Sequence, residues 1–398
     1  MPGWEERPLG VVCTIKPPKS EARAKLADTD AVSFAPMEDL GIGVKYLQPH
    51  RTRPLAEVNG SYTYFADGDV LLAKITPCFE NGKLGVARGL MNGVGFGSSE
   101  YIVLRPAPTL DAEFLYYYLA RPAFLEEGAG TMTGAVGHKP VPKELAESYP
   151  VPLPPLAEQR RIVAILDEAF EGIATAKANV EKSLQSTREL FTERLHAAFS
   201  QRDPGIADAS LSEVCDITSK LVDPREVEFA DLPHVGAGNI ESRTGALIDV
   251  MTARQEQLIS GKFLFDETTV LYSKIRPYLM KVARPDFAGL CSADIYPLTP
   301  RPGLMSRDYL YHLLLSPAFT EFAIKGSARA GMPKVNREHL FAYRLALPSC
   351  DQQQRVTANL DEIDAQTRRL ESIYNAKLAA LDELKRSLLH QAFSGGLS

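Results

Sequence analysis

The chain carries one sequence pattern twice, with a constant offset of 194 residues between the copies. The first copy runs from Leu153-Pro154 through Leu166-Asp167-Glu168 to Leu195-His196-Ala197-Ala198-Phe199-Ser200. The second copy runs from Leu347-Pro348 through Leu360-Asp361-Glu362 to Leu389-His390-Gln391-Ala392-Phe393-Ser394. Loops tolerate insertions, whereas a long helix packed in register does not. The unchanged offset therefore predicts two tandem units, each made of a globular module followed by a long helix.

The repeat divides the 398 residues into four segments. We expect a first module over 1–153, a helix over 154–202, a second module over 203–347, and a second helix with a tail over 348–398. Runs at 69–75 and 101–104 predict strands, and the apolar run 113–119, which stops before Pro122, predicts a helix. Runs at 270–277 and 309–311 repeat this order. Both modules are therefore expected to have a mixed α/β (α+β) fold.

Each helical segment follows a proline-rich strap and carries apolar residues at spacings of four and three. About 40 residues of this pattern form a helix of roughly 60 Å. The expected coiled-coil seam comprises Ile162, Leu166, Ala169, Ile173, Ala176 and Val180, and in the second copy Val356, Leu360, Ile363, Thr367, Leu370, Tyr374, Leu381, Leu384 and Leu388. Small residues in the first helix stand where large ones occur in the second, which favours pairing of the two unlike helices.

Composition limits the kind of nucleic-acid contact that the modules can make. Residues 1–155 carry 15 basic and 18 acidic groups, and residues 204–350 carry 16 and 17, so neither module is a basic domain. Any contact with nucleic acid must use a local patch or partner subunits that supply positive charge.

The five scattered cysteines indicate reduced, mostly buried thiols. Without a signal-peptide pattern or a long apolar run, a cytoplasmic protein is expected.

We find no arrangement of residues that predicts catalysis. The glycine-alternating segment 93–97 lacks a following helix pattern to receive a phosphate and is interpreted as a loop. The seven histidines are dispersed without metal-ligand spacing, so no metal site is expected. Glu383 and Lys385 lie in the heptad helix rather than after a strand, which indicates a solvated helix face and not a nuclease motif. The chain is therefore expected to be non-enzymatic by itself.

The first strap and the duplication together resemble a known family. The segment Val151-Pro152-Leu153-Pro154-Pro155-Leu156-Ala157-Glu158-Gln159-Arg160-Arg161-Ile162, followed by a helix, a second module and a second helix, is similar to the specificity subunit of type I restriction-modification systems. The resemblance covers essentially the whole chain. The second strap departs from it, because Ser349-Cys350-Asp351-Gln352-Gln353-Gln354-Arg355 replaces the Pro-Leu-Ala-Glu-Gln-Arg-Arg pattern.

The resemblance implies both an architecture and a set of partners. It implies that the modules are target-recognition domains, and that the helices pair antiparallel as a spacer in a pseudo-twofold molecule. Two modification subunits dock on it and bring the S-adenosylmethionine site, so no cofactor is expected on this chain; a translocating nuclease subunit completes the restriction complex. The residues assigned to the spacer and to subunit binding are Glu158, Gln159, Arg160, Arg161, Ile162, Leu166, Gln353, Arg355, Val356 and Leu360.

Two unlike modules on a rigid rod predict a bipartite, asymmetric site in double-stranded DNA, with half-site centres about 34–36 Å apart. Polar loops that differ between the copies are the candidates for DNA contact, because Arg, Lys and Asn read base edges or hold phosphates. In the first module they are Lys74, Thr76, Asn81, Lys83, Thr131, Thr133, His138 and Lys139. In the second they are Ser273, Lys274, Arg276, Tyr278, Lys281, Arg329, Lys334 and Asn336. The matching Lys74 and Lys274 are expected to hold backbone phosphate.

Two other classes of function stay open from the sequence. The first is a non-enzymatic adaptor whose coiled coil couples two protein-binding modules, which the acidic net charge of −6 favours. The second is an enzyme with an unrecognised site, which the missing motifs disfavour. Co-purification with a methyltransferase, and site-specific DNA binding only in its presence, would separate these classes.

Overall fold

The computed structural model describes residues 4–132, 139–200, 207–327 and 333–396. It divides into two compact units, one formed by 1–180 with 376–398 and the other by 181–375. Each unit joins one module to parts of both long helices. The four segments expected from the sequence are therefore not the units of packing, because each helix contributes to two cores.

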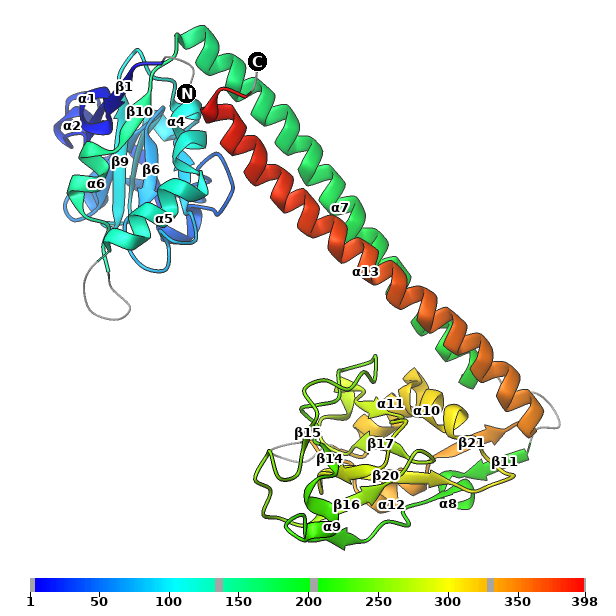
Figure 1. Cartoon of the computed structure of the whole chain (residues 1–398). Helices are drawn as coiled ribbons and strands as arrows, with labels where there is room; N and C mark the ends of the chain where they lie inside the picture. The colour runs from blue at the N-terminus through cyan, green and yellow to red at the C-terminus, as the bar shows by residue number, and fades with distance from the viewer. Residues whose placement is uncertain (1–3, 133–138, 201–206, 328–332, 397–398) are drawn as a thin grey trace. The chain divides into compact units, whose positions relative to one another are not determined.

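In unit 1, the module consists of two four-stranded sheets and short helices (Figure 1). One sheet has the order β2-β9-β6-β7 and the other β4-β3-β8-β5, with a separate β1-β10 ribbon. The elements are β1 Glu6–Pro8, α1 Leu9–Val12, β2 Cys13–Ile15, α2 Ser20–Lys25, β3 Ala31–Ala35, β4 Arg51–Pro54, α3 Leu55–Val58, β5 Thr63–Ala66, β6 Val70–Ala73, β7 Leu84–Val86, β8 Val94–Gly97, β9 Tyr101–Pro106, α4 Ala112–Leu119, α5 Pro122–Thr131, α6 Lys143–Ser148 and β10 Pro150–Pro152. The short 3-10 turns Met37–Asp39 and Met91–Gly93 complete the module.

The helix predicted at 113–119 is present as α4. The carboxylate of Asp111 accepts hydrogen bonds from the backbone N–H groups of Glu113 and Phe114, which caps the start of the helix. The side chains of Phe114 and Tyr118 are buried in a core that also contains Val70 and Leu104 of the sheet. This core therefore lies between α4 and the β2-β9-β6-β7 sheet.

The glycine-alternating segment was expected to be a loop, and this expectation is wrong. Residues 94–97 form the buried strand β8, which pairs parallel with β3 and antiparallel with β5. A Cβ at Gly97 would lie 2.1 Å from the carbonyl oxygen of Ala35, and one at Gly95 would lie 2.1 Å from the ring of Phe65. The glycines are required by these close approaches and not by a turn.

In unit 2, the module repeats this topology with one additional edge strand. The sheet β12-β20-β17-β18 corresponds to β2-β9-β6-β7, and β13-β16-β19-β14-β15 corresponds to the other sheet with β13 added. The elements are β11 Ala207–Ser210, α8 Leu211–Val214, β12 Cys215–Asp216, β13 Leu221–Val222, α9 Val227–Ala230, β14 Pro233–Val235, β15 Met251–Thr252, β16 Lys262–Phe265, β17 Val270–Ser273, the 3-10 turn Pro277–Leu279, β18 Val282–Ala283, β19 Gly289–Cys291, β20 Ile295–Pro300, α10 Arg307–Leu315, α11 Pro317–Lys325, α12 Arg337–Phe341 and β21 Arg344–Leu347. The α/β fold expected for both modules is confirmed.

The two long helices are α7, Leu156–Ser200, and α13, Cys350–Ser394, each of 45 residues. At 1.5 Å per residue each measures about 68 Å. They run antiparallel, since the start of one helix packs against the end of the other (Figure 1). In unit 1, Ile162 and Leu166 share a core with Leu389 and Phe393. In unit 2, Leu195 shares a core with Leu360.

The expected apolar seam is only partly correct. The buried positions gather toward the helix ends, where each module covers the pair: Ile162, Leu166 and Ile173 in α7 and Leu360 in α13 are at most 7% exposed. By contrast, Leu370 and Leu384 were placed in the seam but are 39% and 47% exposed. Two helices alone bury only the residues that face each other, so neighbouring apolar positions stay in solvent.

Three of the five cysteines, Cys13, Cys215 and Cys291, are buried free thiols, as expected, and Cys350 is exposed. Burial raises the pKa of Cys13 and Cys215 to about 12, so both stay protonated near neutral pH. Across the described ranges, none of the helices combines the length and apolarity that crossing a membrane requires.

Candidate functional site

The two groups of candidate contact residues in each module are brought together by backbone pairing. In unit 1, the N–H of Thr76 donates to the carbonyl of Lys139 at 3.4 Å, and the N–H of Val141 donates to the carbonyl of Lys74 at 2.7 Å. In unit 2, the N–H groups of Arg276 and Val335 donate to the carbonyls of Pro333 and Lys274, each at 2.8 Å. We call these surfaces the paired loops: 74–83 with 139–141, and 274–281 with 333–336.

In the first paired loops, several side chains are held by the module. The Lys83 ammonium donates to the carbonyl of Met37 at 2.8 Å, and that of Lys74 donates to the carbonyl of Ser99 at 3.0 Å. The Thr76 hydroxyl donates to the carbonyl of Lys139 at 3.4 Å, whereas Asn81 is exposed. Nearby at the end of α5, the exposed Thr131 donates to the carbonyl of Gly128 at 2.7 Å. Thr133 and His138 lie outside the described residues.

The second paired loops carry different exposed side chains. Arg276 is exposed on a left-handed backbone with φ of +49°, and its side chain has no partner among the described residues. Tyr278 is 50% exposed. The Lys281 ammonium donates to the carbonyl of Ala237 at 2.5 Å, and Lys334 lies 3.4 Å from the carboxylate of Asp294. Asn336 caps α12 by accepting from the N–H of His339 at 2.7 Å.

Two residues of the second module are poorly placed to contact DNA. Ser273 is 2% exposed within β17, so a hydroxyl there does not reach a ligand on the surface. The Lys274 side chain is 13% exposed and donates to the carbonyl of Ala293 and lies 3.7 Å from Asp294. Burial, followed by the charge of Lys334, lowers the pKa of Lys274. We therefore keep neither residue as a DNA contact; Arg329 lies outside the described residues.

A buried glutamine ties the start of each long helix to its own module. The side chain of Gln159 accepts from the N–H of Asp111 at 2.8 Å and donates to the carbonyls of Thr109 and Pro154 at 2.9 and 2.8 Å. Gln353 repeats the arrangement: it accepts from the N–H of Ser306 at 2.8 Å and donates to the carbonyls of Leu304 and Pro348. Both side chains are fully buried. Their hydrogen bonds are therefore used inside each unit rather than offered to a partner.

The other strap residues divide by exposure. Ile162, Leu166 and Leu360 are buried in the helix junctions. Arg160 is 72% exposed with Asp111 at 3.8 Å, and Arg355 is exposed. Glu158 and Arg161 pair at 2.8 Å on the helix surface. Only these exposed residues remain candidates for contact with another subunit.

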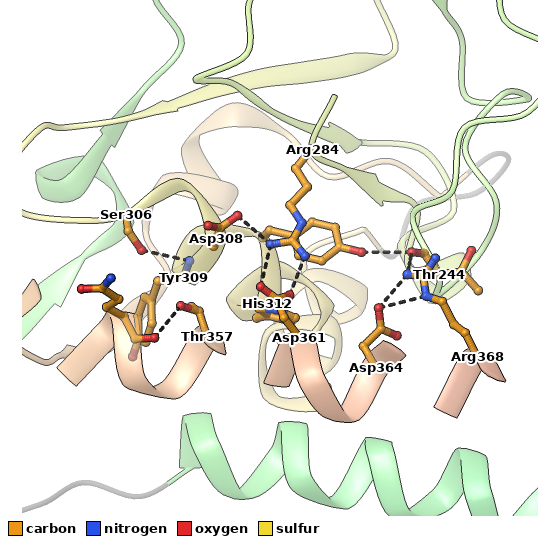
Figure 2. Close-up of polar contacts among 12 residues, drawn as sticks. Thr244, Arg284, Ser306, Asp308, Tyr309, His312, Thr357, Asp361, Asp364 and Arg368 are labelled. Carbon is orange, nitrogen blue, oxygen red and sulfur yellow. Dashed lines mark hydrogen bonds and ion pairs between the residues drawn. The ribbon is translucent and has the colours of Figure 1, made fainter. Parts of the chain in front are cut away.

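A charged cluster lies about two helical turns beyond the buried glutamine of each long helix. In unit 2, the carboxylate of Asp361 accepts from His312 at 2.8 Å and from Arg284 at 2.5 Å, and Figure 2 shows these side chains converging on it. Arg284 also bonds Asp308 at 2.6 Å. Although burial opposes it, hydrogen bonding from Arg284 and His312 lowers the pKa of Asp361. A further contact joins Arg368 of the helix to the carbonyl of Thr244 at 2.6 Å.

In unit 1 the same cluster is built from different residues. Asp167, equivalent to Asp361, accepts from Lys45 at 2.7 Å and from the hydroxyl of Tyr117. Lys45 also bonds Glu113 at 2.6 Å. Lys45 belongs to a loop beside β7, whereas Arg284 follows β18, so the cation comes from a different place in the chain. The sequence did not predict that Lys45 and Arg284 bind these aspartates, because the 194-residue repeat contains the aspartates but neither cation.

The His312 imidazole predicts a pH effect on the stability of unit 2. Its Nδ1 is buried without a partner among the described residues, and burial lowers its pKa below the ordinary 6.5. As the pH falls below about 6.5, His312 takes up a proton in the unfolded chain but not in the folded chain. The free energy of unfolding therefore decreases with falling pH until the pH reaches the pKa of His312 in the folded chain. The tyrosine at the equivalent position 117 has no such titration.

We therefore expect His312→Tyr to flatten the dependence of the melting temperature on pH between about 5 and 6.5. His234, also buried with a lowered pKa, contributes with the same sign and stays in both proteins. Thermal unfolding of both chains across this range tests the prediction. Equal slopes would contradict it.

Comparison with known proteins connects this arrangement to a family. The family model described as the type I restriction modification DNA specificity domain matches residues 1–185 and 206–379, which together span both modules and most of both helices. The chain belongs to this family.

The family's curated members include relatives from bacteria and archaea. The EcoEI specificity subunit of Escherichia coli is 41% identical over 162 residues, and the EcoDI subunit is 32% identical over 186 residues. These matches cover 40% and 47% of this chain but only 27% and 41% of the relatives, so less than half of each relative is aligned. The MjaVIII specificity subunit of Methanocaldococcus jannaschii is 22% identical over 72% of this chain and 70% of its own.

Solved structures share the specificity-domain fold across the whole chain. A chain from a type I restriction-modification system superposes with a TM-score of 0.80 at 21% identity, covering 100% of this chain and 99% of its own. The HsdS subunit from Thermoanaerobacter tengcongensis gives a TM-score of 0.64 at 20% identity, covering 100% and 98%. Among the described residues, no cluster of three or more His, Cys, Asp or Glu side chains is arranged to hold a metal ion.

Proposed function

We propose that this chain is the DNA sequence-specificity subunit of a type I restriction-modification complex, in which each module reads one half of a bipartite, asymmetric site. The observation that carries the proposal is a duplicated framework with unlike exposed side chains. The backbone pairing of the paired loops is the same in both modules, whereas the exposed polar side chains differ: they are Glu80 and Asn81 in the first module, and Arg276, Tyr278, Lys334 and Asn336 in the second. A backbone framework that both modules share, with different exposed side chains in each, suits recognition of two different half-sites.

The helix pair is proposed to set the distance between half-sites and to dock modification subunits. Leu190, Leu370, Ile373 and Leu384 are 39–52% exposed on the two helices. Such apolar positions on an otherwise polar pair support contact with other helices. The exposed Arg160, Arg161 and Arg355 near the helix starts are further candidates for these contacts. A translocating nuclease subunit is proposed as an additional partner.

The chemistry is proposed to reside on the partners. S-adenosylmethionine is expected to bind the modification subunits, and this chain is expected to select the DNA sequence without catalysing a reaction. The near-neutral modules support this division, because affinity for the phosphate backbone is then shared with other subunits.

The test is a genome-wide map of methylated adenines in cells with and without this chain. We expect one bipartite motif to lose its methylation completely when the chain is deleted and to regain it on complementation. An unchanged map would contradict the proposal. Co-purification with protein partners but no site-specific DNA binding would instead favour the adaptor.

A further inference from the structure

A cleft of about 720 Å³ lies on the first module next to its paired loops. It is bounded by the turn after β2, by β5 and β9, and by α6. Lys74 and Val141, which form the backbone bridge of the paired loops, also line the cleft. The cleft is therefore continuous with the surface proposed to contact DNA.

Four lysines line this cleft: Lys16, Lys19, Lys74 and Lys143. Lys16 is exposed, and its side chain has no partner among the described residues. The Lys19 ammonium is held by the carbonyls of Asn59 and Gly60 at 3.3 and 2.5 Å. Carbonyl oxygens orient an ammonium group but do not neutralise its charge. Lys19 is therefore a fixed positive charge.

Acidic groups compensate only part of this charge. Glu147 is the acidic residue of the lining and pairs with Lys143 at 2.5 Å, and Glu100 lies 3.4 Å from Lys74. Lys16 and Lys19 have no carboxylate partner among the described residues. Burial, followed by repulsion from Lys16 and Arg23, lowers the pKa of Lys19.

The second module has no equivalent pair of lysines. Counting on from the matched Cys13 and Cys215, Thr218 stands at the position of Lys16 and Leu221 at that of Lys19. Leu221 is 59% exposed. The concentration of charge therefore belongs to the first module and is not a requirement of the shared fold.

We infer that this cleft binds the sugar-phosphate backbone of DNA beside the half-site that the first module reads, with Lys16 and Lys19 facing phosphates. Lysine holds phosphate as a point charge, and such contacts fix position without reading sequence. The inference rests on the proposed function and adds an asymmetry to it: the first module depends more strongly on backbone charge than the second. Lys16 is the main residue because it is exposed and its side chain has no partner in the part of the chain that the structure describes.

The experiment measures DNA binding by the complete complex of this chain with its modification subunits, on a duplex carrying the mapped site. For Lys16→Ala we expect three- to tenfold weaker binding near 0.1 M salt, and a plot of log affinity against log salt that is shallower by about 0.9. Lys16→Ala with Lys19→Ala should roughly double this change in slope, because both lysines are assigned to phosphates. Lys16→Arg should restore both quantities, and the methylated motif should stay the same in all variants.

The control is Arg51→Ala, which removes an exposed cation from the first module away from the cleft. Arg51 lies on β4, at the opposite edge of the sheet from β5, and pairs with Glu38 at 3.1 Å. A second arm uses duplexes carrying only one half-site: the Lys16→Ala effect should persist with the first half-site and disappear with the second. Melting curves of each variant exclude unfolding as the cause.

The outcomes separate the inference from the proposed function. The cleft assignment is overturned if the salt slope is unchanged in both lysine variants, or if Arg51→Ala changes the slope as much as Lys16→Ala does. In either case, site-specific DNA binding by the parent complex still upholds the proposed function. A change in the methylated motif would make Lys16 a base-reading residue and also overturns the assignment. Absence of site-specific binding by the parent complex overturns both.

Discussion

Replacement of Gln353 by leucine is expected to lower the free energy of unfolding of unit 2 by about 3 kcal/mol. The side chain is fully buried and satisfies one N–H and two carbonyls of the module, at Ser306, Leu304 and Pro348. Leucine has a similar volume but leaves these backbone groups without a partner, and each unsatisfied buried group costs about 1–3 kcal/mol. Urea unfolding followed by circular dichroism measures the effect.

The neighbouring Gln354 provides a matched control, because it is exposed on the same turn of α13. Gln354→Leu should change the free energy by less than about 0.5 kcal/mol. Gln159→Leu should destabilise unit 1 as Gln353→Leu destabilises unit 2, since the two glutamines make equivalent bonds. A midpoint shift that is the same for Gln353→Leu and Gln354→Leu would show that the buried bonds contribute nothing.

Deletion of matched heptads from both helices is expected to abolish methylation of the natural site. Removing 178–184 from α7 and 372–378 from α13 preserves the antiparallel pairing, because the two segments occupy equivalent places in the repeat. It shortens the pair by about 10 Å, which corresponds to about three base pairs of DNA. We expect at least a hundredfold loss of methylation at the natural spacing, measured on duplexes whose central gap varies by one base pair at a time.

Any activity that remains should appear at a shorter gap. Three base pairs also rotate one half-site by roughly a quarter turn about the DNA axis, so recovery at the new gap is expected to be partial. The control deletes the heptad from α7 alone, which disrupts the pairing and should lower melting temperature as well as methylation. Unchanged spacing preference in the double deletion would mean that the helices do not measure the gap.

The structural features that the sequence predicted correctly were those marked by a regular apolar spacing or by the constant offset between the two repeats. The 194-residue repeat predicted two long helices, and the structure has α7 and α13 with matching buried glutamines and matching, partly exposed aspartates. The apolar run 113–119 predicted α4, because helical spacing and the following proline define a helix locally. These signals depend on neighbouring residues along one element, which a sequence displays directly.

The features that the sequence did not reveal depend on what another segment supplies. Gly95 and Gly97 suggested a loop, but they lie in strand β8, where glycine is required because Phe65 and Ala35 approach closely. Leu370 has the spacing of a seam residue, yet it is 39% exposed, since only the modules at the ends complete the burial of the pair. Of the candidate contact residues, Ser273 has the right chemistry and the right place in the sequence but lies inside the sheet.

The sequence by itself determined the tandem architecture, the extent of the helices and the two loop segments that differ between the copies. Repeats and regular spacings are visible along the chain without knowledge of its three-dimensional structure. Only the tertiary structure decided which of those loop residues reach the surface and that Lys45 and Arg284, from non-equivalent positions, both pair with the repeated aspartate. It also brought the cleft lysines together. Electrostatic and hydrogen-bonding energies depend on distances of a few ångströms between segments far apart in the chain, and the sequence does not contain those distances.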